Sequence, residues 1–327
     1  MNINGGVIGK QNASSGSVAT GVWALHEFYL RKISGQWPSG SVPMGDVDYT
    51  ICAGGGARGA ASGTAAAAWG GGGAGGYINS YGTAVSALTL LTTTPYTVTI
   101  GAAATAYATN GSNSSITGVD TSSVFTITAI GGGGGGSGAS TSDADLDGKD
   151  GGSGGGGASL ENGQNPTYAG TPGSGTTNQG GPGSTGTARP VFPWYCTESW
   201  GAPLAQCNGF PGQSTGGGGG GASGGNLGTS ISGQIGVQNS ITGSNVYRSG
   251  GGDGYNNSSG GNGYDQAGGG GSGSYPYGKN GILILRYSNA YTISNPGGGL
   301  TIATSTVSSD KVSQITAGTG ILQFAAN

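Results

Sequence analysis

The chain has 327 residues, of which 79 are glycine and 12 are proline; 33 % are hydrophobic, only 7 % are charged, and the formal net charge is −3. A collagen triple helix is excluded because no Gly-X-Y period is sustained, and the low charge favours an ordered globular chain over a disordered one. The ten basic residues form no patch, no apolar run could span a bilayer, and no secretory signal begins the sequence, so we expect no nucleic-acid partner, no membrane insertion and synthesis in the cytoplasm.

Residues 1–45 differ from the rest of the chain and predict one short helix. Ser17 can act as its N-cap, and Gly35 lies where a glycine commonly follows a helix. Apolar side chains recur between them at helical spacing. The candidate oligomer and attachment surface comprises Val18, Val22, Trp23, Leu25, Tyr29 and Ile33. One helix cannot bury this surface alone, so we expect it to pack on the domain, on a second copy of the chain or on another protein.

The next segment, residues 46–130, predicts a series of half-buried strands. Thr, Val and Ile alternate in it, as strands with one buried face require. The expected strands cover residues 47–53, 87–93, 96–102, 114–119 and 123–130. The first and the last of these run directly into glycine, at Gly54 and at Gly131.

Residues 131–280 are glycine tracts with polar and aromatic inserts, followed by an apolar run that begins at Ile282. This closing segment, residues 281–288, predicts a strand buried on both faces. Such a strand after 150 glycine-rich residues implies that the chain returns to the same core. We therefore take 46–288 as one glycine-rich domain. The tail, residues 289–327, predicts a small module of about four short strands, with "SSD" and "AGTG" as turns.

Glycine tracts that return to one place can form a rigid lattice. Polyproline-II-like helices have three residues per turn and no internal hydrogen bonds, so neighbouring helices can bond one another if no Cβ intervenes. Tracts near 70–76, 131–136, 151–157, 216–221 and 268–271 are candidates. Flexible spacers are the alternative. The predicted fold is mainly β with a glycine-rich, polyglycine-II-type core and little α-helix.

The arrangement resembles the glycine-rich adhesins at the tips of T-even-type long tail fibres of bacteriophages. It is more closely similar to glycine-rich virion proteins of marine podoviruses, on "GVIGKQNASSGSVATGVWALHEFYLRKISGQWP", "YTICAGGG" and "GKNGILILRYS"; the insert 160–265 matches nothing in them. The resemblance implies a structural virion protein, most simply a tail fibre or receptor-binding adhesin, with a capsid fibre or decoration protein as the alternative. The resemblance also implies homotrimers and contact with other virion proteins through residues 1–45. It implies that the receptor is a carbohydrate or an outer-membrane protein of the host. A non-viral surface or ice-binding protein is a further alternative.

An acidic loop suggests a calcium site. Asp143, Asp145 and Asp147 alternate and Gly148 follows them, as at the start of a D-x-D-x-D-G calcium loop, but Gly154 stands where a bidentate Glu is expected. Asp150 could compensate for the missing ligand. The alternative is a solvated acidic loop. No cofactor is required, and calcium is the one ion that the sequence suggests.

An aromatic-rich segment, 189–212, interrupts the glycine tracts. Rigidly held aromatics serve as binding hot spots, but they also form small satellite cores. The candidate receptor-binding residues are Phe192, Trp194, Tyr195, Trp200 and Phe210. Cys196 and Cys207 bracket the segment and could form a disulfide after exposure to an oxidising medium.

Other side chains give weaker indications. Cys52 lies within a predicted strand and is expected to be a buried small hydrophobe. A tyrosine series (Tyr247, Tyr255, Tyr264, Tyr275 and Tyr277) could line a sugar-binding surface or cover the lattice edge. The single histidine, His26, lies in the predicted helix, so no His-based triad or zinc site can be built. We expect no enzyme.

Overall fold

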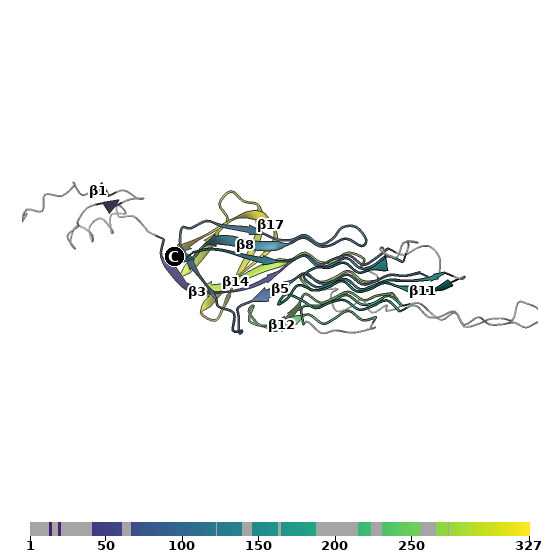
Figure 1. Cartoon of the computed structure of the whole chain (residues 1–327). Coiled ribbons are helices and arrows are strands. Elements are labelled where there is room, and N and C mark those ends of the chain that lie inside the picture. Colours follow the sequence, from purple (N-terminus) through teal and green to yellow (C-terminus); the bar gives the residue numbers. More distant parts are fainter. Residues whose placement is uncertain are drawn as a thin grey trace, which may run out of the picture.

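The computed structural model describes residues 13–14, 19–20, 41–60, 67–121, 123–138, 146–162, 165–187, 215–223, 231–255, 266–273 and 275–327. Every element that it defines in these residues is a strand. Figure 1 shows an antiparallel sheet at one end of the molecule and a bundle of extended glycine tracts at the other. Each region is built from several separate stretches of the sequence. The predicted fold class, mainly β with little helix, is confirmed.

The large sheet has ten antiparallel strands. They are β3 (Pro43–Cys52), β5 (Tyr77–Asn79), β6 (Leu88–Leu91), β7 (Tyr96–Thr99), β8 (Ser114–Val119), β9 (Val124–Ala129), β14 (Ile282–Ser288), β15 (Tyr291–Ser294), β16 (Leu300–Val307) and β17 (Asp310–Ala326). The main path runs β5-β3-β14-β17-β7-β8-β9, with β6 beside β3 and with β15 and β16 beside β17. All five strands predicted between residues 47 and 130 are present.

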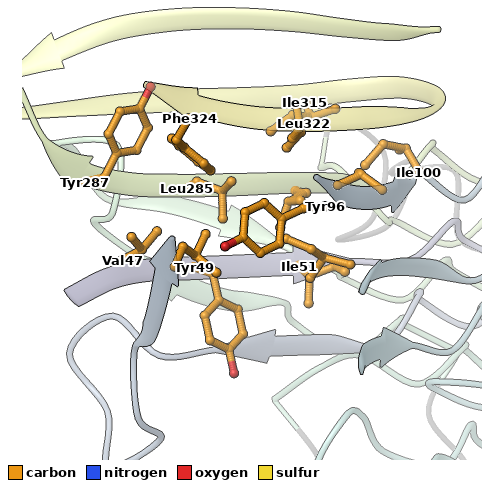
Figure 2. Close-up of a cluster of buried hydrophobic side chains, with 14 of the residues drawn as sticks. Val47, Tyr49, Ile51, Tyr96, Ile100, Leu285, Tyr287, Ile315, Leu322 and Phe324 are labelled. Carbon is orange, nitrogen blue, oxygen red and sulfur yellow. The ribbon is translucent and has the colours of Figure 1, made fainter. Parts of the chain in front are cut away.

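Strand β14 lies at the centre of this sheet and is buried on both faces, as predicted. It pairs with β3 on one side and with β17 on the other. Leu283, Leu285 and Tyr287 belong to the main core. Figure 2 shows Leu285 and Tyr287 there with Tyr96 and Phe324. The alternate residues, among them Ile282 and Ile284, enter a second cluster with Cys52 and Tyr77. The chain therefore does return to its first core after the glycine tracts.

The tail differs from its prediction, because its last strand is 17 residues long. The first half of β17 pairs with β14 (Leu283 opposite Ile315), and the second half pairs with β7 (Thr319 opposite Thr99). The sequence "AGTG" is therefore not a turn. It lies inside β17, where Gly318 adopts a φ of +99° as the strand changes partners.

Seven shorter strands complete the described structure: β1 (Ala13–Ser14), β2 (Ala19–Thr20), β4 (Ala67–Ala68), β10 (Ser159–Asn162), β11 (Asn165–Ala169), β12 (Val237–Asn239) and β13 (Val246–Arg248). Strand β2 corrects the N-terminal prediction at two positions. Ala19 and Thr20 pair with β1 rather than forming the first turn of a helix capped at Ser17. The rest of the predicted helix lies outside the described residues.

Hydrogen bonds show three residues per turn in the glycine tracts. In tract 53–59, the amides of Ala53, Gly56 and Gly59 donate to the neighbouring tract 70–76, at 2.9 to 3.0 Å. The amides between them donate in turn to residues 108–112 and to residues 276–279. A bond to the same neighbour at every third residue is the geometry of a polyproline-II-type helix, in which all bonds go to other helices.

Tract 70–76 is the centre of the lattice. Its amides donate to tracts 131–136, 216–221 and 268–271, and its carbonyls accept from tracts 53–59, 151–157 and 249–254. Six neighbours thus surround one helix, and all seven residues of the tract are buried. All five tracts named from the sequence are lattice members, so they are structural elements rather than spacers.

Glycine is required here for its missing side chain. Of the described glycines in these tracts, only Gly268 has a positive φ, so the backbone of the others is open to any L-residue. Neighbours exclude the side chain instead. A Cβ on Gly72 would meet the carbonyl oxygen of Gly56, and one on Gly132 would meet that of Gly73, far inside the 3.0 Å limit for real Cβ contacts.

Side-chain amides satisfy backbone groups where the lattice ends. Asn110 Oδ1 accepts from Gly134 N at 2.9 Å and Asn113 Oδ1 accepts from Gly131 N at 2.8 Å. Gln179 is bidentate, because its Oε1 accepts from Ile130 N while its Nε2 donates to Thr128 O. An amide side chain carries the same donor and acceptor as a peptide, so each replaces a missing neighbour.

Candidate functional site

The lattice separates the two ends of the molecule. The chain enters β3 from Ser41, whose Oγ lies 3.3 Å from Thr93 Oγ1, just after β6. The C-terminus is marked at the sheet end in Figure 1. Gly76, which donates to Ile130 just after β9, marks the border with the sheet. Gly70 donates to Gly136 six residues further out, so segments that leave the lattice beside Gly70 and Gly136 lie at its remote end.

The aromatic-rich segment is attached at this remote end. Thr187 and Thr215, which flank residues 188–214, exchange two backbone hydrogen bonds of 2.8 and 2.9 Å. Ser159 Oγ donates to Thr215 O at 3.1 Å and ties the pair to β10. The candidate receptor-binding residues Phe192, Trp194, Tyr195, Trp200 and Phe210 lie outside the described residues, as do Cys196 and Cys207.

The acidic loop begins at the same end, and two of its four aspartates are described. Asp147 Oδ1 accepts from both the amide and the hydroxyl of Thr171, at 2.7 and 2.9 Å. Asp150 Oδ1 accepts from Ser174 N at 2.6 Å. These two carboxylates therefore fasten residues 171–174 to the lattice. In the described part of the chain no three potential metal ligands gather; Asp143 and Asp145 lie outside it, and calcium binding stays a prediction.

A second candidate site consists of described residues, and we call it the aromatic–arginine cluster: Arg58, Trp69, Tyr107, Tyr255 and Tyr277. The Arg58 guanidinium carbon lies 4.1 Å from the Trp69 ring centroid and 4.9 Å from that of Tyr107. Tyr255 meets Trp69 edge to face at 4.4 Å, and Tyr277 lies 5.7 Å from Tyr107. Arginine over aromatic faces is a favourable cation–π arrangement.

Lattice hydrogen bonds fix these side chains relative to one another. Ala108 N donates to Arg58 O, and Arg58 N donates to Pro276 O, both at 2.9 Å, so the segments that carry Tyr107 and Tyr277 flank Arg58. Tyr255 N donates to Trp69 O at 3.0 Å. Four lattice segments and one turn thus present five side chains as a single group.

A family model described as a glycine-rich domain matches residues 33–321. The chain belongs to this glycine-rich domain family. Searches of curated proteins and of solved structures gave no match. The match spans most of the sheet and the whole described lattice. In this chain the glycines of the matched region build the lattice, whose packing leaves no room for a Cβ.

Arg58 in the glycine-rich domain has a partly buried guanidinium with a lowered pKa. Burial lowers the pKa of its guanidinium, and the neighbouring Tyr107 and Tyr277 partly oppose this. Nη1 donates to Gly59 O at 2.8 Å, while Nε is buried without a partner, as is Trp69 Nε1. No carboxylate of the described residues pairs with Arg58. The one sequence signal that could have pointed to Arg58 is an isolated charge inside a glycine tract.

The tyrosine series divides into separate groups in the glycine-rich domain. Tyr277 and Tyr255 join the cluster, and Tyr275 is near Tyr277 in sequence. Tyr247 lies on β13 and is exposed, and Tyr264 lies outside the described residues.

Cys52 is fully buried, and burial raises the pKa of its thiol to about 11, which confirms that it is a small buried hydrophobe. No helix in the described residues is long and apolar enough to cross a membrane.

Proposed function

We propose that this protein is an adhesin of a tailed-phage virion, a tail-fibre or receptor-binding protein that presents segments to the host surface from the remote end of a rigid lattice. The observation that carries the proposal is the polarity of the molecule. Ser41, in the predicted attachment segment, contacts Thr93 beside the sheet, whereas Thr187 and Thr215, which flank the aromatic-rich segment, pair beside β10 at the remote end of the lattice. The resemblance to phage adhesins supports the viral assignment.

The lattice suits this role because it lowers the conformational cost of binding. A segment anchored to a flexible chain loses freedom on binding, and that loss subtracts from its affinity. Here Thr187 and Thr215 bond to each other, and the nearby Gly186 and Gly217 donate to Gly170 O and Gly157 O. The positions at which the segment leaves and returns are therefore fixed. Residues 1–45 would join the protein to other virion proteins or to two further copies in a trimer.

Location within purified virions tests the assignment. Gold-labelled antibodies against the lattice should mark the tips of the tail fibres. A label spread over the capsid would replace the adhesin with a capsid decoration protein, and particles without label would remove the viral assignment.

Binding of the isolated protein to host cells tests the presenting role. Trp194→Ala combined with Trp200→Ala should reduce the cell-bound fraction about tenfold or more, as expected for aromatic hot spots. Tyr247→Ala is the matched control, because it removes an exposed aromatic from β13. Equal binding by the double variant and the control would exclude the aromatic-rich segment as the receptor site.

A further inference from the structure

We propose that the aromatic–arginine cluster is a binding site for acidic polysaccharide, in which a carboxylate of the glycan accepts from Arg58 and a sugar ring stacks on Tyr107 or Tyr277. The site contains none of the residues of the aromatic-rich segment 189–212. It deepens the adhesin proposal by naming a ligand class, yet it rests on described residues alone.

Arg58 supplies the anion-binding group. Its Nη1 bonds to Gly59 O and its Nε is buried. The remaining terminal nitrogen, Nη2, makes no hydrogen bond in the described part of the chain and is not among its buried atoms without a partner. A guanidinium that is partly desolvated and lacks a carboxylate partner gains most from an anionic acceptor, because charge-assisted hydrogen bonds are stronger than neutral ones.

The two tyrosines supply the stacking surface. Tyr107 and Tyr277 remain 43 % and 44 % exposed although their rings lie 5.7 Å apart, tilted by 41°. Exposed paired rings with hydroxyl groups offer an apolar face and polar edges, which suits a pyranose ring with its C–H face and hydroxyls. Their sequence neighbours Ala108 and Pro276 are hydrogen-bonded to the backbone of Arg58, which fixes the segments that carry the two rings.

The geometry favours a glycan over a protein partner. Protein hot spots place aromatic anchors in well-packed pockets, whereas here the rings stand on tightly packed backbone tracts. The chain as a whole carries a formal charge of −3, so long-range attraction does not bring a polyanion to it. Recognition has to come from the local contact between Arg58 and one carboxylate.

Binding to immobilised polysaccharides tests the inference. Full-length protein should bind at least one of four carboxylated polymers: alginate, polygalacturonate, hyaluronan and polysialic acid. It should bind the same polymer about tenfold less well after its carboxylates are reduced to alcohols. Failure to bind any of the four, or equal binding after reduction, would overturn the proposal.

Variants then locate the site. Tyr107→Ala with Tyr277→Ala should reduce affinity about tenfold or more, while Tyr247→Ala, on β13, should leave it unchanged. Should the double variant unfold, Tyr277→Ala alone serves, because it leaves the contact between Tyr107 and Arg58 in place. Unaltered affinity in a folded variant would contradict the proposal. Because Trp194 and Trp200 are intact in this experiment, its failure leaves the cell-binding test of the adhesin untouched.

Discussion

Replacing Gly133 by alanine tests whether the lattice is rigid structure, because a spacer would tolerate one methyl group. The Cβ would lie 2.8 Å from Lys149 C, 2.9 Å from Gly155 N, and still closer to Lys149 O. It would therefore stand across the hydrogen bond from Gly155 N to Lys149 O. Both neighbours are backbone, so neither can rotate away as a flexible side chain would.

The cost of Gly133→Ala follows from the bonds that must shift. Gly133 N donates to Ser153 O at 2.9 Å, and Gly133 O accepts from Gly73 N at 2.7 Å. With the bond between Gly155 and Lys149, three bonds are weakened, each with a net contribution of about 0.5–1.5 kcal/mol. Overpacking adds about 1–3 kcal/mol, and the lower entropy of the unfolded alanine chain offsets about 0.4–1 kcal/mol. Complete loss of the three bonds would give a net loss of about 1.5–7 kcal/mol; because the bonds are weakened rather than lost, we expect about 2–5 kcal/mol.

Thermal unfolding followed by circular dichroism measures this loss. For a domain of this size it corresponds to a decrease in Tm of roughly 5–15 °C. Ala102→Ser is the matched control, since it also adds one heavy atom to a lattice segment, but at an exposed position, and should change stability by less than about 0.5 kcal/mol. If Gly133→Ala melts within about one degree of the wild type, the lattice interpretation of tract 131–136 is wrong.

Two further predictions concern the sheet and one the lattice edge. Tyr96 OH accepts from Leu91 N at 2.6 Å in a fully buried site, so Tyr96→Phe should cost about 1–3 kcal/mol in denaturant unfolding. Burial raises the pKa of the Cys52 thiol to about 11. The contribution of the neutral thiol to folding stability is therefore complete below the unfolded pKa of about 8.5 and is lost as pH rises towards 11. Over this pH range the free energy of unfolding of the wild type should fall by about 2–3 kcal/mol more than that of Cys52→Ala. Gln179→Ala leaves Ile130 N without its acceptor and should speed amide exchange there, whereas exchange at Gly134 N, which donates to Asn110 Oδ1, should not change.

Much of the fold is predictable because its signals are local. Alternating Thr, Val and Ile mark β7, β8 and β9, and the unbroken apolar run of β14 marks a strand with two buried faces. The lattice is predictable from the return of the chain to its first core, because the glycines between β9 and β14 must then lie in ordered structure. Glycine tracts entered directly from Ala53 and Ile130 supported that step.

The parts that were missed depend on contacts distant in sequence. "AGTG" has turn composition, but Gly318 instead bends β17 between two partners. Gln179 looks like a surface residue until tract 131–136 is known to end beside it. Arg58 has its ring neighbours at positions 69, 107 and 277 only because the lattice brings their segments together. The spacing of these four residues in the sequence does not indicate that their side chains lie together.

The lattice also explains how one framework can carry unrelated inserts. Its hydrogen bonds join backbone groups, and its packing depends on absent side chains, so the bonds of tract 70–76 do not depend on the side chains of other segments. A conventional core would couple the two, because side chains that pack together constrain one another. At the bridge between Thr187 and Thr215 the two described segments are joined by backbone hydrogen bonds. These bonds do not depend on which side chains the two positions carry, so the attachment point keeps its geometry by the same means as the lattice.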